Sequence, residues 1–139
     1  MANKTVVYTY VVGDLLHIGH LKCLQQAKAL GDYLIVGVLT DEATVAYKRC
    51  PIIPFRERIE MVANLKCVDE VIQQNSLDPT ENIMRIKPDI VTHSHKEKEK
   101  FPGANVEALM NELKGKAIHT HYYQGTSTTK IIKKIRELP

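Results

Sequence analysis

The sequence predicts an α/β fold built on a doubly wound parallel sheet. Apolar runs rich in Val, Ile and Tyr alternate along the chain with segments of helical spacing. Such alternation implies right-handed crossovers and a parallel sheet covered by helices on both faces. A chain of 139 residues has room for one hydrophobic core, and no internal repeat or linker divides it. We therefore expect one Rossmann-like domain spanning residues 1–139.

The first half of the chain contains two strand–helix units and a further helix. The first strand is followed, after Gly13, by helical spacing through LKCLQQAKAL, which Gly31 ends. Thr40 and Asp41 resemble a helix N-cap, and Pro51 and Pro54 interrupt the segment that follows. The expected ranges are strands Thr5–Val12 and Tyr33–Leu39 and a later helix from about Phe55 to Leu65.

The second half continues the alternation. Its last segment, GTSTTKIIKKIREL, reads as a helix opened by hydroxyl residues. The other expected ranges are strands Val68–Gln73, Lys87–His93 and Ala117–Tyr122, and helices Pro79–Ile86 and Asn105–Leu113.

Composition excludes several classes of protein. The net charge of +3 is small and dispersed, and the cluster HKEKEK (His95–Lys100) alternates in sign, which argues against nucleic acid. The longest apolar runs fall far short of the roughly 20 residues that span a bilayer. No signal peptide is recognised at the N-terminus, and Cys23, Cys50 and Cys67 match neither a disulfide framework nor a zinc site. We expect reduced thiols and a cytoplasmic protein without a membrane span.

The stretch HIGH is the first candidate site. Parallel doubly wound sheets bind ligands beyond the carboxyl ends of their strands, and HIGH follows the first strand. Gly13 permits a tight turn, and a helix N-terminus attracts anions. A helix beginning near Leu15 or Leu16 would place His17 and His20 on one face, where both imidazoles could meet one phosphate. Ordinary polar residues at a helix start are the alternative; a metal site is disfavoured because the i, i+4 spacing and an accompanying carboxylate are missing.

Two further groups of residues could bind anions. Gly125 precedes four hydroxyl residues, Thr126 to Thr129, at a helix start, although Ser and Thr also favour such positions as simple N-caps. Lys48 and Arg58 could supply counter-charges for a triphosphate, although single cations here are commonly solvated surface residues.

These motifs resemble those of the HxGH nucleotidyltransferases, and within them the cytidylyltransferases that activate glycerol phosphate, phosphocholine, phosphoethanolamine and phosphonates. The resemblance covers most of the chain: GDLLHIGHLKCLQQAKALGDYLIVGVLTDE matches the opening of that family, ERIEMV and CVDEVI its middle, and GTSTTKI its C-terminal signature.

The resemblance implies in-line attack of a substrate phosphate on the α-phosphorus of CTP, with release of pyrophosphate, Mg²⁺ bound with the CTP, and a homodimer. His17 and His20 would stabilise the α-phosphoryl transition state, and Lys48 would bridge CTP and the acceptor. The other implied nucleotide contacts come from the turn, the later strand end and the C-terminal signature: Val12, Gly13, Asp14, Arg58, His93, Gly125, Thr126, Ser127 and Thr128.

The sequence departs from the family pattern at three places. Val11 and Val12 replace the first positions of the GTFD turn, and His93, Ser94 and His95 replace an acidic segment. The family's RTEGIST signature has an arginine that faces the phosphates, whereas YYQ precedes Gly125 here. Two alternatives stay open: an adenylyltransferase that uses ATP, of the flavin mononucleotide or phosphopantetheine type, and a nucleotide-binding module without turnover.

Overall fold

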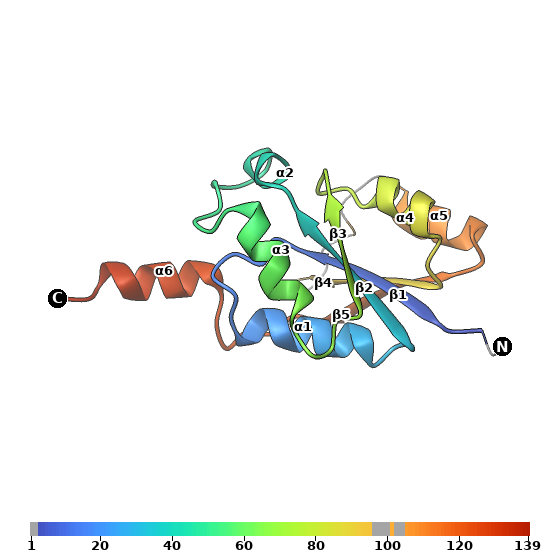
Figure 1. Cartoon of the computed structure of the whole chain (residues 1–139), viewed down its shortest axis with the longest axis horizontal. Helices are drawn as coiled ribbons and strands as arrows, with labels where there is room; N and C mark the ends of the chain where they lie inside the picture. The colour runs from blue at the N-terminus through green and yellow to red at the C-terminus, as the bar shows by residue number, and fades with distance from the viewer. Residues whose placement is uncertain (1–2, 96–100, 102–104) are drawn as a thin grey trace.

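The computed structural model describes residues 3–95, 101 and 105–139, so most of the charged cluster predicted as a solvated face, residues 96–100, lies outside the described residues. Strands and helices alternate as expected (Figure 1). In chain order they are β1 (Val6–Val11), α1 (Ile18–Lys28), β2 (Tyr33–Leu39), α2 (Asp41–Val45), α3 (Phe55–Ala63), β3 (Glu70–Gln74), α4 (Thr80–Ile86), β4 (Ile90–His95), α5 (Val106–Glu112), β5 (Lys116–His121) and α6 (Thr128–Arg136).

The five strands form one parallel sheet in the order β3-β2-β1-β4-β5. This confirms the predicted fold class. The strand bounds differ from the expected ranges by up to three residues. β4, for example, begins at Ile90 and not at Lys87, because Lys87 is the left-handed C-cap of α4.

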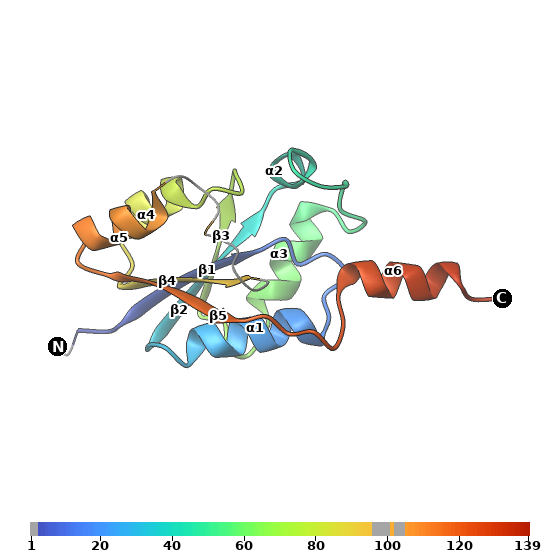
Figure 2. The same cartoon turned by 180° about the vertical axis from the view of Figure 1, so that it is seen from behind.

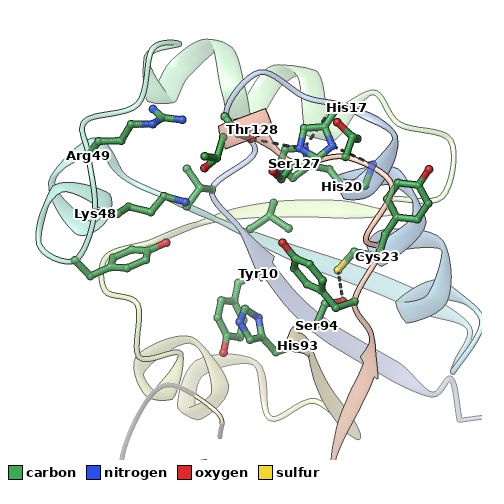
Figure 3. A pocket seen from close by; sticks show the side chains of 18 residues that line it. Tyr10, His17, His20, Cys23, Lys48, Arg49, His93, Ser94, Ser127 and Thr128 are labelled. Carbon is green, nitrogen blue, oxygen red and sulfur yellow. Dashed lines mark hydrogen bonds between the residues drawn. The ribbon is translucent and has the colours of Figure 1, made fainter. Parts of the chain in front are cut away.

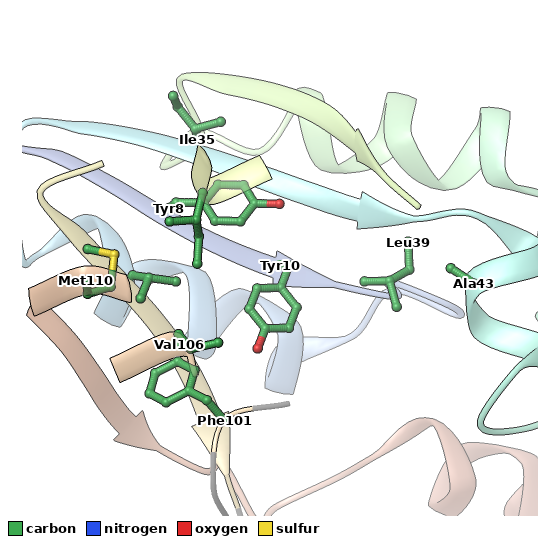
Figure 4. Packing of buried hydrophobic residues seen from close by; sticks show 10 residues of the cluster. Tyr8, Tyr10, Ile35, Leu39, Ala43, Phe101, Val106 and Met110 are labelled. Carbon is green, nitrogen blue, oxygen red and sulfur yellow. The ribbon is translucent and has the colours of Figure 1, made fainter. Parts of the chain in front are cut away.

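Helices cover both faces of the sheet, and the side chains of β1 alternate between them. On one face, Val7 packs with Leu24 and Ala27 of α1 and with Val62 of α3. On the other face, Tyr8 and Tyr10 pack with residues of α2, α4 and α5, as Figure 4 shows for Ala43, Val106 and Met110. Period-two alternation in the central strand therefore fixes two separate apolar cores, one on each side of the sheet.

The strand order reverses at β1, because the chain passes from β1 outward through β2 and β3 and then returns to β4 on the other side of β1. The crevice between the carboxyl ends of β1 and β4 is where a doubly wound sheet binds ligands. This position lies directly beside the start of α1, so the HIGH stretch borders the crevice.

Helix α6 projects away from the body of the molecule in both views (Figures 1 and 2). None of its residues is buried. Its N-terminus nevertheless adjoins the crevice, because the Thr128 hydroxyl donates to the backbone carbonyl of Asp14 at 2.9 Å.

Among the described residues, no helix is both long and apolar enough to cross a membrane.

Candidate active site

A cavity of about 420 Å³ opens at the crevice between β1 and β4. It is within the usual size range of small-ligand sites. Its walls come from the ends of β1 and β4, the start of α1, the connection between α2 and α3, and residues 122–129 (Figure 3). The structure brings the following predicted site residues to this cavity: Val12, His17, His20, Lys48, His93, Thr126, Ser127 and Thr128.

The two histidines belong to the N-terminus of α1, but the helix begins later than Leu15 or Leu16. Its first residue is Ile18, and His17 is the N-cap with extended backbone. Nδ1 of His17 accepts the N–H of Gly19 at 3.0 Å, and Nδ1 of His20 accepts the N–H of His17 at 3.1 Å. This reciprocal capping box, made by imidazoles instead of the usual hydroxyl and carboxylate, places the rings side by side with centroids 3.9 Å apart.

The capping box also determines where the histidine protons lie. Because each Nδ1 accepts a backbone N–H, each neutral ring carries its proton on Nε2. Burial lowers the pKa of His17, and burial with the neighbouring His17 and Lys48 lowers the pKa of His20 to about 3. Both rings are therefore neutral near pH 7, and each has an Nε2–H to donate.

The start of α6 lies next to the His17 ring in the wall of the cavity. Ser127 is the N-cap, and its hydroxyl accepts the N–H of Lys130 at 3.1 Å. The Thr128 hydroxyl lies 3.3 Å from Nε2 of His17. Because the first N–H groups of a helix have no partner within it, this end of α6 combines amide and hydroxyl donors. The simple N-cap interpretation of Ser127 and an anion-binding role are thus compatible.

Lys48 reaches the cavity from the connection between α2 and α3 (Figure 3). Its ammonium lies 5.7 Å from the centre of the Tyr47 ring. Partial burial, together with the positive charge of Arg49, lowers the pKa of Lys48 from its ordinary value. A desolvated cation gains more from an approaching anion than a fully hydrated one does.

Asp14 does not reach the cavity; it holds the connection that carries Lys48. Its carboxylate accepts the N–H groups of Ile52 and Ile53, each at 3.0 Å, and pairs with Arg49 at 2.9 Å. Burial acts to raise the pKa of Asp14, but these three donors outweigh it and keep the pKa below its ordinary value. The structure thus gives this predicted nucleotide contact a positioning role. Gly13, with φ of 71°, supplies the turn before it and also lies outside the cavity.

Arg58, expected at the nucleotide, is instead buried behind the site, with 1% of its surface exposed. Its guanidinium donates to the backbone carbonyls of Val12 and Leu39, at the ends of β1 and β2. It also donates to the carbonyl of Ile53 and pairs with Asp41 at 2.7 Å. These contacts use its donors on the protein itself, so Arg58 joins the strand ends to the connection before α3.

His93 lies at the end of β4 and stacks on Tyr10 of β1, with centroids 4.5 Å apart and planes 6° apart. Both rings line the cavity (Figure 3). Ser94, next along β4, joins Thr120 and Cys23 through its hydroxyl at 2.8 and 3.1 Å. The residues that replace the acidic segment of the family thus present an aromatic and hydroxyl wall.

Sequence reasoning overlooked several cavity residues. Gly125, a predicted nucleotide contact, does not itself line the cavity; a Cβ on it would collide with the Tyr123 ring, and one on Gly19 would press on His17 and approach Tyr123. Tyr123 thus packs close to both glycines, and Tyr122 and Tyr123 both line the cavity. Arg49 was missed as well, although its position beside Lys48 was a usable signal. Tyr10 was hidden within an apolar run.

Metal-binding residues do not gather in the part of the chain that the structure describes. No group of three or more His, Cys, Asp and Glu side chains is placed to hold a metal ion there. The three cysteines are free thiols.

The fold and the cavity together define an α/β nucleotidyltransferase-type protein, with paired imidazole donors at the first crossover and a hydroxyl-rich helix start beside them. Residues 13–134 match the sequence profile of the family described as cytidylyltransferase-like. The chain belongs to that family, and the resemblance inferred from its motifs is confirmed.

The relatives have several different names. The chain is 35% identical over 136 residues to the bifunctional protein HldE of Helicobacter pylori, covering 96% of this chain and 28% of that protein. It is 42% identical over 87 residues to the ethanolamine-phosphate cytidylyltransferase of Arabidopsis thaliana, covering 61% of this chain and 21% of the relative. The chain thus spans less than a third of these curated relatives.

A solved structure supports the same fold. The lipopolysaccharide core biosynthesis protein of Thermoplasma volcanium GSS1 superimposes with a TM-score of 0.77 at 30% identity, covering 88% of this chain and all of that one. These comparisons agree on the nucleotidyltransferase family and leave the nucleotide and the acceptor to be proposed.

Proposed function

We propose that this chain transfers CMP from CTP to a small phosphorylated or phosphonylated alcohol. Glycerol 3-phosphate, phosphoethanolamine, phosphocholine and a phosphonate are the candidate acceptors. An oxygen of the acceptor attacks the α-phosphorus of CTP, and the bond from that phosphorus to the oxygen bridging to the β-phosphate breaks. The products are a CDP- or CMP-linked alcohol and pyrophosphate.

The observation that carries this proposal is the convergence of two kinds of phosphate donor on one cavity. The Nε2–H groups of His17 and His20 and the donors of Ser127 and Thr128 line the same cavity, and the Thr128 hydroxyl lies 3.3 Å from Nε2 of His17. We assign the histidines to the α-phosphate, where negative charge builds up in the transition state, and the α6 donors, including Thr126, to the β- and γ-phosphates. Neutral imidazoles can fill this role because each keeps an Nε2–H that donates to a phosphate oxygen as its negative charge increases.

Lys48 also lines this cavity, and we assign it to the bridge between the nucleotide and the acceptor. Two phosphates repel each other at bonding distance, so a cation between them is most useful in the transition state. His93 and Tyr10 are assigned to recognition of the base or the acceptor, because they form the aromatic wall of the cavity.

Mg²⁺ is proposed to enter with the nucleotide. Mg²⁺ commonly keeps several waters and binds through substrate phosphates instead of an all-protein cage. The described residues fit that mode, since they provide hydroxyl and imidazole donors around the cavity but no cluster of metal ligands. Its chemistry would be to neutralise charge on the phosphates.

The remaining assignments concern the whole molecule. We propose that residues 1–139 act as one catalytic domain in the cytoplasm, where the free thiols would stay reduced. We also propose a homodimer. Ile135 on α6 and Leu138, which follows the helix, are 57% and 70% exposed, and a second copy of the chain would cover them.

The function is tested by incubating the protein with Mg²⁺, either CTP or ATP, and each candidate acceptor, and by measuring pyrophosphate. We expect release with CTP and one of these acceptors. His17→Ala or His20→Ala should lower kcat by about 10²-fold or more while the melting curve stays cooperative, because each removes a transition-state donor.

Each other outcome points to a different function. Equal or greater release with ATP would contradict the choice of CTP and favour an adenylyltransferase. Tight CTP binding without pyrophosphate from any acceptor would indicate a binding module. Normal turnover of the histidine variants with reduced thermal stability would show that the pair is structural.

A further inference from the structure

The cavity has few positive charges for the ligand it is proposed to hold. Within residues 3–95, 101 and 105–139, its cationic side chains are Lys48 and Arg49. The two histidines are neutral near pH 7 because burial lowers the pKa of both. A nucleoside triphosphate carries several negative charges, so any cation here has a large effect on binding.

Arg49 is held at the cavity by an ion pair with Asp14, and it can leave this partner for another anion. Its Nη1 lies 2.9 Å from Oδ2 of Asp14 and 3.1 Å from the carbonyl of Cys50. The Arg49 side chain is 37% exposed, whereas that of Asp14 is 4% exposed. The Asp14 carboxylate also accepts two backbone N–H groups, so it remains hydrogen-bonded when Arg49 leaves. Because the Asp14 carboxylate is buried, the loss of Arg49 costs more than breaking an exposed ion pair does, and the charge of a bound triphosphate must offset that cost.

The position of this ion pair indicates which phosphates Arg49 can reach. The backbone carbonyl of Asp14 accepts the Thr128 hydroxyl at 2.9 Å, so the pair adjoins the first turn of α6. In Figure 3, Arg49 and Lys48 extend into the cavity from the same connection, with Thr128 and Ser127 beyond them. Arg49 thus lies on the side of the cavity where the α6 hydroxyls and amides bind anions, away from His93.

We propose that Arg49 exchanges Asp14 for the β- and γ-phosphates of the nucleotide and binds the departing pyrophosphate. This inference rests on the proposed nucleotidyl transfer. A guanidinium binds two phosphate oxygens at once, which an ammonium cannot do.

The test measures binding of magnesium pyrophosphate by isothermal titration calorimetry, which requires neither turnover nor a known acceptor. Arg49→Ala should weaken pyrophosphate binding about tenfold or more and raise the KM for CTP similarly, while CMP binding changes less than about twofold. Arg49→Lys should recover part of the loss. The matched control is Arg56→Ala, which removes an exposed arginine of α3 outside the cavity.

Melting curves identify any loss of binding that comes from unfolding, and Arg49→Gln serves as a second variant if Arg49→Ala melts early. Equal loss of CMP and pyrophosphate affinity would overturn the inference, because the effect would then not be specific to the β- and γ-phosphates. If the wild type releases pyrophosphate but Arg49→Ala binds it within twofold of normal, this inference alone fails. If the wild type neither binds nor releases pyrophosphate, the proposed function fails with it.

Discussion

The rings of His17 and His20 both cap a helix end and line the cavity where we propose that phosphates bind. Nδ1 of each ring accepts a backbone N–H, and this contact fixes which nitrogen keeps the proton. The spacing in HxxH matters here because it equals the spacing of an N-cap and the third helical residue. A single local structure therefore sets the position, tautomer and charge of both donors.

The lowered pKa of His20 predicts a pH effect on stability. The folded protein resists protonation of His20 until about pH 3, whereas the unfolded chain binds that proton near pH 6.5. The free energy of unfolding should therefore fall as the pH drops from about 6.5 toward 3, because the unfolded state binds more protons there.

His20→Gln should remove the part of this pH dependence that comes from protonation of His20 in the unfolded chain. Urea titrations of the wild type and the His20→Gln variant at pH 7, 5.5 and 4.5 measure the free energy of unfolding. The difference between the two proteins separates the effect of His20 from that of the other titrating groups. Parallel curves for the two proteins over this range would show that His20 titrates normally in the folded state.

Arg58 is predicted to be a stability residue and not a ligand. Arg58→Ala leaves the carbonyls of Val12 and Leu39 without their buried donor and removes the partner of Asp41. We expect a loss of about 3 kcal/mol in the free energy of unfolding, measured with urea.

The control for this variant lies two residues away on the same helix. Arg56→Ala alters an exposed side chain and should change stability by less than about 0.5 kcal/mol. Full stability of Arg58→Ala combined with a large rise in the KM for CTP would instead favour the nucleotide contact expected from the sequence.

At the scale of elements, the connection between α2 and α3 carries Lys48 and Arg49, two cations of the cavity wall. Asp14 fixes it from the β1 side through the amides of Ile52 and Ile53, and Arg58 fixes it from α3 through the carbonyl of Ile53. The segment has little regular structure of its own between Val45 and Phe55. Its conformation therefore depends on two buried charged residues from neighbouring elements.

Lys48 on this connection is predicted to act mainly in the transition state. Lys48→Ala should lower kcat by about 10²-fold while CTP binding without acceptor changes much less, because the two phosphates repel most strongly as they react. Lys48→Arg should rescue little, since a planar guanidinium cannot replace a compact charge. Steady-state kinetics and calorimetry with CTP measure the two effects.

Lys22 is the matched control, because it is an exposed lysine on α1 that does not line the cavity. Lys22→Ala should leave kcat nearly unchanged. Turnover of Lys48→Ala within about twofold of the wild type would refute the bridging role.

At the scale of the whole molecule, the strand order assembles the cavity. Because β1 and β4 are neighbours in a parallel sheet, the segments after both strands open at the same edge. The chain after β5 returns to this edge and brings the start of α6 beside Asp14. Residues more than 100 positions apart in sequence, such as His17 and Thr128, meet there as a result.

Two exposed apolar residues, Ile135 on α6 and Leu138 just after it, predict association between two chains. Ile135→Lys combined with Leu138→Lys should shift the mass measured by light scattering from two chains toward one, because the variant places charges where apolar contact is expected. Met84→Lys changes an exposed apolar residue of another helix, α4, and is the control that should leave the mass unchanged. A monomeric wild type, or a dimer that the double variant does not weaken, would exclude this mode of association.

Patterns between near neighbours in the sequence were enough to predict much of this protein. The alternation of apolar runs and helical segments predicted the parallel sheet, and the positions of His17, His20, Ser127 and Thr128 after strand ends predicted most of the cavity. These features follow from local periodicity and from a general property of parallel sheets, so the sequence by itself contains them.

The tertiary structure decided the roles of the charged residues. Arg58 meets the carbonyls of Val12 and Leu39 only because β1 and β2 end side by side, and Asp14 meets Ile52 and Ile53 only because the connection folds back over β1. Arg49 lines the cavity because it lies on the same connection. Whether a charge faces a ligand or buried backbone depends on which distant segments surround it, and residue type and spacing do not specify that arrangement.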